Sequence, residues 1–293
     1  MSFPPGILLV DKPVGPTSHD VVSRVRKAVE LRRVGHAGTL DPFASGLLII
    51  LIGKATRLSE YLLGLYKVYE AAAHLGIETT THDPEGSIVS ETQVREGLTR
   101  EEVEGALATF SGEILQEPPV FSAKKVRGEA AHRRVQRGED VVLEKARVTI
   151  YEMALTTFAP PEVGFRVRCS AGTYIRALGR DLGRALGVGA HLKALRRTGI
   201  GGFSVDSALS LSDLESEEEL AGHLISPADA LSHLPSVAVG QADAGRIRQG
   251  QFLPLADEEL PEGGPVRILL EGDLLAIGVR NGDHLRPRKV LKS

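Results

Sequence analysis

Short apolar segments follow one another along this chain without a regular helix between each pair. Gly, Pro, Asn and Asp end each segment, which is typical of strands that are joined by turns. We expect strands at residues 7–10, 47–52, 67–75, 112–116, 120–126, 141–144, 147–157 and 164–170. A doubly wound parallel sheet needs a helix after each strand. The order therefore predicts an α+β fold with a mixed, largely antiparallel sheet and helices packed on it.

Four segments have the spacing of helices. Residues 19–31 follow Thr17 and Ser18, either of which can cap a helix, and Thr99 with Glu102 forms a capping box for a helix to about residue 110. A short cationic helix is expected at 130–137, and a longer one at 174–186. In the longer helix the leucines recur on one face, so we expect Arg176, Arg180 and Arg184 to point outward on the other.

An acidic stretch at residues 211–220 marks a candidate domain boundary. Beyond it, short apolar runs alternate with Gly, Asp and Asn turns, which is typical of a small β-barrel. A chain of 293 residues has room for two domains at roughly 150 residues each. We expect a large domain over residues 1–234 and a small β-barrel-like module over 235–293.

Composition excludes several classes of protein. The single cysteine allows no internal disulfide and no cysteine-based zinc site, and it fits a reducing compartment. The longest aliphatic run, at 47–52, is far shorter than the ~20 residues that span a bilayer, and the amino terminus lacks a basic, apolar secretory signal. No phosphate-binding glycine loop occurs. We expect a cytoplasmic protein without a membrane partner.

Charge is unevenly distributed along the chain. The net charge of −3 argues against a nucleic-acid partner, but residues 166–200 hold eight Lys or Arg and only one acid, Asp181. Basic segments that share a face would give a polyanion a positive groove despite the total; the alternative is an ordinary solvated surface. The expected phosphate-binding face consists of Arg196 and Arg197 together with Lys124, Lys125, Arg127, Arg133, Arg134 and Arg137.

One loop has the residues that chemistry needs. Residues 35–46 (GHAGTLDPFASG) contain three glycines and place Asp41 before Pro42, which favours an extended backbone at the aspartate. Apolar neighbours would lower the local dielectric around a carboxylate that can act as a nucleophile or a base. An isolated Asp-Pro pair more often simply forms part of a turn. Whether this loop is catalytic must therefore be judged from the other segments of the chain.

Several further segments, in order, resemble the TruB family of tRNA pseudouridine synthases. The loop itself resembles that family's GHxGxLDPxAxG motif. The other segments are GILLVDKPVGPTSHDVV (6–22), KVYEAAAHLG (67–76), PPVFSAKKVRGE (118–129), CSAGTYIRALGRDLG (169–183) and HLKALRRTGIG (191–201). The resemblance covers residues 6–205 nearly end to end. It implies the pseudouridine synthase fold, and the strand pattern of the last 60 residues resembles a PUA domain, which binds RNA.

The resemblance implies an enzyme that isomerises a uridine in the T loop of tRNA, at position 55, without cofactor or metal. It identifies Asp41 as the catalytic carboxylate, and places the tyrosine of the KxY segment, Tyr69, against the target base. Arg176 of the GTYIR segment is expected to form a bidentate pair with Asp41 and keep it ionised. Tyr174 and Leu195 complete the slot for the base, which must leave its stack to enter.

Two further residues and two alternative functions remain. His36 is expected beside the catalytic loop, where it can stack on RNA, and Lys12 either supports the pocket or reaches a phosphate. One alternative is a tRNA-folding chaperone that acts without chemistry. Another is a hydrolase with paired carboxylates, for which the matched motifs offer only Asp181 and Glu70 as a second acid. We expect a monomer whose partner is the T arm of tRNA.

Overall fold

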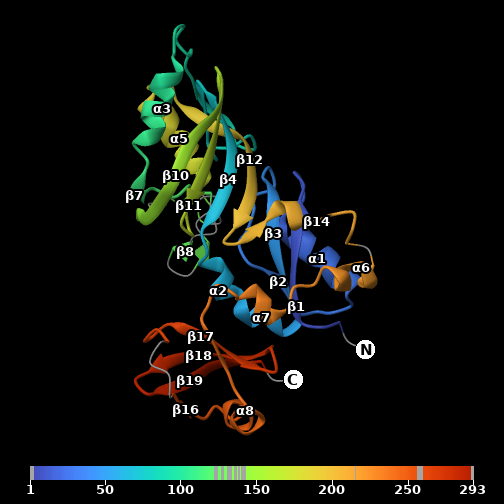
Figure 1. The fold of residues 1–293 in the computed structure, drawn as a ribbon. Helices are drawn as coiled ribbons and strands as arrows, with labels where there is room; N and C mark the ends of the chain where they lie inside the picture. Colours follow the sequence, from blue (N-terminus) through green and yellow to red (C-terminus); the bar gives the residue numbers. More distant parts are fainter. Residues whose placement is uncertain are drawn as a thin grey trace.

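The computed structural model describes residues 3–121, 125–126, 129–130, 134, 137, 139, 143–214, 216–255 and 260–291. A ten-stranded sheet forms the body of the protein, and a five-stranded sheet follows it (Figure 1). The strands of the large sheet are β1 (Gly6–Lys12), β2 (Val34–His36), β3 (Ser45–Ile52), β4 (Lys67–Leu75), β7 (Gly112–Gln116), β10 (Ala146–Ala159), β11 (Glu162–Cys169), β12 (Ala190–Ile200), β13 (Phe203–Ser204) and β14 (Leu209–Ser210).

The large sheet is mixed and mostly antiparallel, as predicted. Its order is β14-β1-β3-β12-β4-β11-β10-β7, with β2 beside β3 and β13 beside β12. Only β14 on β1 and β3 on β12 run parallel to their neighbours. The parallel register places Gly46 opposite Arg197, and so brings the loop before β3 against the middle of β12. The pairing of β3 with β12, two strands that are far apart in the sequence, determines where the site lies.

The helices and short hairpins are inserted between these strands. They are α1 (Ser18–Ala28), η1 (Gly53–Leu58), α2 (Ser59–Leu63), the hairpin β5 (Ile77–Thr79) and β6 (Ile88–Glu91), α3 (Arg100–Ala108), the hairpin β8 (Lys125–Val126) and β9 (Glu129–Ala130), α5 (Ile175–Ala185), η2 (Val205–Ser207), α6 (Glu217–Gly222) and α7 (Pro227–Ala230). The expected capping box forms at Thr99 with Glu102, and Thr17, one of the two candidate caps, forms a second box with Asp20. Each satisfies two backbone N–H groups that a helix start leaves free.

Some local predictions differ from the structure. Residues 143–144 are not in a strand, and the expected helix at 130–137 lies mostly outside the described residues. The β5–β6 hairpin was not predicted. The arginines of α5 were predicted to point outward, but Arg176 and Arg180 are 7% and 4% exposed. That prediction was wrong because carboxylates and carbonyl groups from distant segments surround both side chains.

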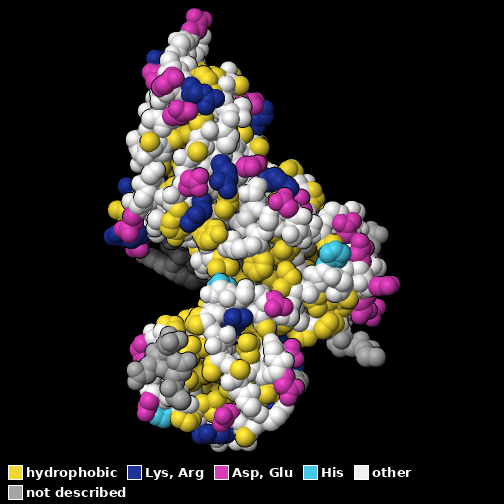
Figure 2. Space-filling view, in the orientation of Figure 1, with side chains coloured by type: hydrophobic (Ala, Val, Ile, Leu, Met, Phe, Trp, Pro, Cys, Tyr) yellow, Lys and Arg dark blue, Asp and Glu magenta, His cyan; other side chains and the backbone are white. Residues whose placement is uncertain are grey.

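The core lies on both faces of the sheet at its β1–β3 end and on one face at the other end. Helices α3 and α5 pack on the buried residues of β4, β11 and β12, including Phe165 and Leu192. None of the described helices covers the opposite face of these three strands, and acidic and basic side chains are interspersed on it (Figure 2). Arg168 lies on this face between the rings of Tyr66 and Tyr151, 4.9 and 5.3 Å from their centres.

The smaller sheet begins just after Pro235. Its strands are β15 (Ser236–Ala238), β16 (Leu253–Pro254), β17 (Pro265–Leu270), β18 (Asp273–Asn281) and β19 (His284–Val290), in the order β15-β17-β18-β19-β16. The sheet is curled into a half-barrel, which agrees with the β-barrel-like module that the turn spacing predicted. It also carries α8 (Gln241–Arg248), a helix that was not predicted and that buries only Ala244 and Ile247.

The two sheets share a hydrophobic cluster. Leu274 and Ile277 of β18 pack with Leu58 and Leu62, which lie in η1 and α2. Lys289 of β19 donates to the carbonyl of Arg57 at 2.6 Å. These contacts fix the smaller sheet against α2. No helix of the described residues has the length and hydropathy that a membrane span requires.

Candidate active site

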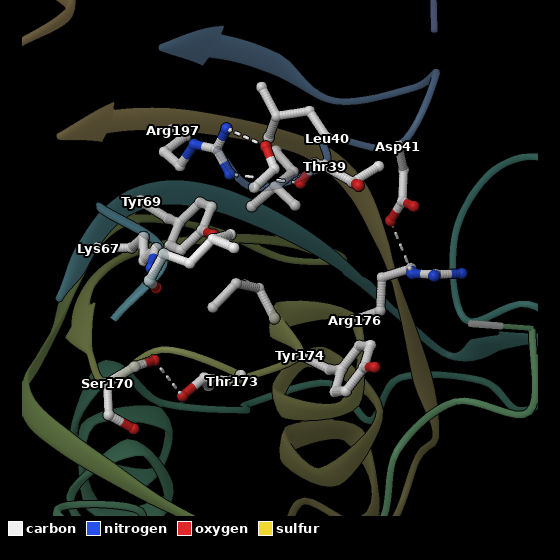
Figure 3. A pocket seen from close by; sticks show the side chains of 15 residues that line it. Thr39, Leu40, Asp41, Lys67, Tyr69, Ser170, Thr173, Tyr174, Arg176 and Arg197 are labelled. Carbon is white, nitrogen blue, oxygen red and sulfur yellow. Dashed lines mark hydrogen bonds and ion pairs between the residues drawn. The ribbon is translucent and has the colours of Figure 1, made fainter. Parts of the chain in front are cut away.

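A cavity of about 310 Å³ opens where the loop before β3 meets β4, β12 and the start of α5. Its volume is at the lower end of the range for small-molecule sites. Its walls include all three predicted catalytic residues, Asp41, Tyr69 and Arg176, and also Tyr174 and Leu195 (Figure 3). The structure therefore brings together five of the residues that the sequence selected from four separate segments.

The loop that carries Asp41 is fixed on both sides of the aspartate. Before it, the N–H of Leu40 donates to Oγ of Ser18 at 2.8 Å, and the Ser18 hydroxyl donates back to the carbonyl of Leu40. After it, the carbonyl of Pro42 accepts from the N–H of Gly15 at 2.8 Å. A loop held in this way keeps its carboxylate in one position, as a catalytic group requires.

Asp41 and Arg176 form an ion pair through a single contact. Nε of Arg176 lies 3.1 Å from Oδ2 of Asp41, whose side chain is 37% exposed through the pocket mouth. Burial raises the pKa of Asp41 above its usual value, and the positive charge of Arg176 opposes this shift. The predicted bidentate pair is not formed, because the terminal nitrogens of Arg176 have other partners.

Those partners include a carboxylate that the sequence did not single out, Asp83. Its Oδ2 lies 2.8 Å from Nη1 of Arg176, and its side chain is 2% exposed. Nη1 also donates to the carbonyl of Thr81, and Nη2 donates to that of Phe121 at 2.9 Å. Asp83 is in turn held by the Thr81 hydroxyl and by the N–H of Glu85. Arg176 thus bridges the Asp41 loop and the β5–β6 turn.

Tyr69 and Tyr174 reach the pocket from different elements. Tyr69 is buried on β4, and burial is the main cause that raises the pKa of its hydroxyl. Tyr174 precedes α5, and its backbone N–H and carbonyl are both bound by the side-chain amide of Gln116, at 2.8 and 3.0 Å. Leu195 of β12 supplies an apolar wall between them.

The other predicted binding residues have different surroundings. Arg197 lines the pocket but is 1% exposed, so the prediction that it lies on an exposed phosphate-binding face was wrong. Its guanidinium donates instead to the carbonyls of Leu47, Thr39 and Gly38, at 2.7, 3.3 and 3.0 Å. These carbonyls lie on both sides of Asp41 in sequence, and Arg197 therefore helps to hold the loop.

Lys12 is fully buried and donates to the carbonyls of Pro13, Pro16 and Pro42. It therefore supports the loop, as one of its two predicted roles required, and its amine is not available to a phosphate.

Two other predicted residues, His36 and Arg196, do not line the cavity. His36 lies on β2 with its Nδ1 buried and without a hydrogen-bond partner, and burial lowers the pKa of its ring. Arg196 forms an ion pair with Asp11 at 2.6 Å. Lys124 lies outside the described residues.

Neither acid proposed for a hydrolase is at the pocket. Asp181 binds Arg180, and Glu70 follows Tyr69 on β4 and so points to the opposite face of the sheet. The second carboxylate of the site is Asp83. Its only signal in the sequence is the polar turn TTTHDPEG, in which Thr and Asp side chains can bond to neighbouring backbone.

Comparisons with known proteins agree with this geometry. Residues 26–175 match the TruB family pseudouridylate synthase N-terminal domain, and residues 176–232 and 235–291 match two C-terminal domains of the same family. The chain belongs to the TruB family. It is 42% identical over 288 residues to the tRNA pseudouridine synthase B of Azoarcus sp. (strain BH72), with 98% of this chain and 94% of the relative covered. The relative in Ralstonia nicotianae has the same identity and coverage over 297 residues.

Solved structures with the same architecture include chains of complexes that contain RNA or protein partners. A chain of the Cbf5–Nop10–Gar1 complex aligns with a TM-score of 0.76 and 29% identity, over 99% of this chain and 85% of its own. A chain of an H/ACA ribonucleoprotein bound to a substrate RNA aligns with a TM-score of 0.75 and 28% identity, over 98% and 85%. The predicted family, fold class and isomerase activity are confirmed.

Proposed function

We propose that this TruB-family enzyme isomerises the uridine at position 55, in the T loop of tRNA, and that Asp41 is its catalytic carboxylate. The observation that carries the proposal is the ion pair of Asp41 with Arg176 beside a buried tyrosine, in a pocket large enough for one nucleoside. The curated relatives are named as tRNA-modifying enzymes. T-loop specificity rests on the resemblance of the motifs in the sequence.

The reaction breaks the C1′–N1 bond of uridine, turns the base, and joins C5 to C1′. It needs an ionised carboxylate near C1′, whether that group attacks C1′ or removes the proton on C2′. Arg176 favours the ionised form of Asp41 in a pocket that otherwise disfavours charge. Tyr69, Tyr174 and Leu195 would enclose the base and exclude water while it turns.

The target nucleotide must leave the stacked T loop to enter this pocket. Unstacking costs a few kcal/mol, which contacts elsewhere must offset. We propose that residues 1–234 form the catalytic domain and that residues 235–293 form a PUA-like module that binds another part of the RNA. We propose that the protein is a monomer and that it acts in the cytoplasm, where its proposed tRNA substrate is found.

The direct test is to incubate the protein with an unmodified tRNA transcript and to map pseudouridine by carbodiimide-dependent stops of reverse transcription. We expect one new stop at position 55. A stop at another uridine would refute the T-loop assignment, and release of free uracil would support the hydrolase instead. A matched transcript with cytidine at position 55 is the control, and it should give no stop.

A further inference from the structure

Two buried cations occupy the end of the pocket away from Asp41. Lys67, which is 7% exposed, and Arg197 both line the cavity, and Figure 3 shows them on either side of Tyr69, with Asp41 and Arg176 across the pocket. The amine of Lys67 donates to the carbonyls of Leu63 and Leu65. The sequence analysis gave Lys67 no role.

These cations differ from Arg176 in their partners. Arg176 is bound to two carboxylates, whereas Lys67 and Arg197 are bound to carbonyl oxygens. Among the described residues, no Asp or Glu lies within ion-pair distance of either group. The nearby thiol of Cys169 does not compensate them, because burial raises its pKa to about 11 and keeps it neutral. This wall of the pocket therefore carries net positive charge.

Holding a cation here is unfavourable for the folded protein. Burial, and to a smaller extent the charge of Arg197, lower the pKa of Lys67 to about 8. A buried charge without a counter-ion is costly unless something else offsets it. Carbonyl groups at the end of α2 offset part of the cost. Uncompensated charge at the wall of an active site is expected where opposite charge develops during the reaction.

We propose that Lys67 and Arg197 form an anion site that stabilises the detached uracil as a uracilate during the isomerisation. The inference rests on the proposed function, in which Asp41 acts at C1′. Asp41 lies at one end of the pocket and the two cations lie at the other, beside Tyr69, so a nucleoside bound with its sugar at Asp41 would direct its base toward Lys67 and Arg197. The pocket would then match the charge separation of the reaction.

The chemistry balances without a further reactant. When the C1′–N1 bond breaks, its electron pair remains on the base, and the negative charge spreads over N1, O2 and O4. Asp41 meets the electron deficiency at C1′, either by forming a C1′–O bond or by removing the C2′ proton that it later returns. The base then donates an electron pair from C5 to C1′. C5 loses a proton and N1 gains one, so substrate and product have the same atoms.

A purely structural role for Lys67 makes a different prediction. Its amine caps the end of α2, and loss of this cap would disturb the pocket wall for every substrate equally. An anion site acts on the leaving base instead. The anion site should therefore contribute less to the rate when the base is itself a better leaving group. Fluorine at C5 withdraws electrons and makes uracil such a base.

The experiment compares Lys67→Met with the wild type on two tRNAs that are assembled by ligation and differ only at position 55, which is uridine or 5-fluorouridine. Single-turnover loss of the N1-linked nucleoside is followed by digestion and mass spectrometry. We expect a loss of about 100-fold on uridine, the size seen when one stabilising donor is removed, and a loss below about 10-fold on 5-fluorouridine. Lys67→Arg should recover most of the rate. Lys193→Met removes an exposed lysine of β12 and should change neither rate.

A second neutral variant separates charge from helix capping. Lys67→Gln keeps N–H donors for the carbonyls of α2 while it removes the charge, and it should show the same difference between the two substrates. An equal loss on both substrates, for either variant, would overturn the anion site and leave a structural role. A wild-type protein that does not modify position 55 would instead refute the proposed function, so the two failures are distinguishable.

Discussion

Arg176 divides its guanidinium between two carboxylates of unequal exposure. Asp83 is enclosed and takes a terminal nitrogen, while Asp41 takes Nε and remains accessible from the pocket. Asp83 therefore fixes the arginine, and the arginine in turn orients Asp41. Burial, the largest influence on Asp41, raises its pKa, and Arg176 is the next largest and lowers it. The ionisation of the catalytic group therefore depends on a residue 135 positions away in the sequence.

Removing this arginine should move the acidic limb of the pH–rate profile. Arg176→Met alone leaves Asp83 buried without its partner, which costs about 3–5 kcal/mol, so it is combined with Asp83→Asn. Asp41 must be ionised, and its ionised fraction falls as the pH drops through its pKa. Arg176 lowers the pKa of Asp41 by more than Asp83 raises it. When both charges are removed, we therefore expect the pKa of Asp41 to rise and the acidic limb to move to higher pH.

The measurement is the single-turnover rate from pH 4 to 8 (about the range in which a raised aspartate titrates), with tRNA affinity measured at each pH. Asp83→Asn alone is the control, and its limb should move to lower pH because the nearby negative charge is gone. A limb of the double variant at or below the wild-type position would contradict the electrostatic role of Arg176.

The sequence predicted the ion pair of Asp41 and Arg176 but not the surroundings of the other cations. The pair could be predicted because both residues belong to ordered motifs. Arg197 and Lys12 read as surface cations, since the carbonyls that bind them belong to loops that only the folded chain brings near. Asp83 was missed because an Asp-Pro pair in a polar turn usually has only a local role.

At the scale of elements, α5 is buried on both sides and passes very close to β12. A Cβ on Gly183 would lie 2.2 Å from the backbone nitrogen of Ala190, and one on Gly179 would lie 2.7 Å from Leu192. The two glycines allow α5, which carries Arg176 in its first turn, to approach the strand that carries Leu195 and Arg197. The pocket width therefore depends on residues that do not touch it.

Gly183→Ala should destabilise the protein, although alanine usually favours a helix. The added methyl group would force backbone apart, and we expect a loss of about 2–3 kcal/mol in the free energy of unfolding. Gly105→Ala in α3 is the matched control: a Cβ there meets nothing within 4 Å, and we expect a gain of about 0.5–1 kcal/mol. Urea unfolding measures both, and similar values for the two variants would contradict the close approach.

The net charge of a sequence segment was a poor predictor of the charge on the folded surface. Most cations of the strongly basic segment 166–200 have an acidic partner, in several cases from another strand. The pairs outside the pocket are Arg166–Glu152, Arg180–Asp181, Arg184–Asp181, Lys193–Glu162 and Arg196–Asp11. In the folded sheet these acidic side chains neutralise much of the excess positive charge that residues 166–200 have in the sequence. A positive groove therefore does not follow from the segment's composition.

At the scale of the whole molecule, the smaller sheet borders the elements that lead into the pocket. Lys289 of β19 contacts Arg57 and Tyr61, and the chain runs from there through the end of α2 at Leu63 to Lys67, the first residue of β4. The largely antiparallel sheet and the half-barrel could be predicted from the spacing of apolar segments and turns. The pairing of β3 with β12 could not, because parallel neighbours that are far apart in sequence leave no local signal.

The central claim is that Asp41 performs the chemistry in a pocket that also binds tRNA. Asp41→Asn keeps the shape of the side chain and removes its charge, while Asp213→Asn changes a half-buried aspartate that does not line the pocket and is the control. We expect Asp41→Asn to bind unmodified tRNA with nearly wild-type affinity and to form no pseudouridine at position 55. Pseudouridine formation by Asp41→Asn at the wild-type rate would contradict the account.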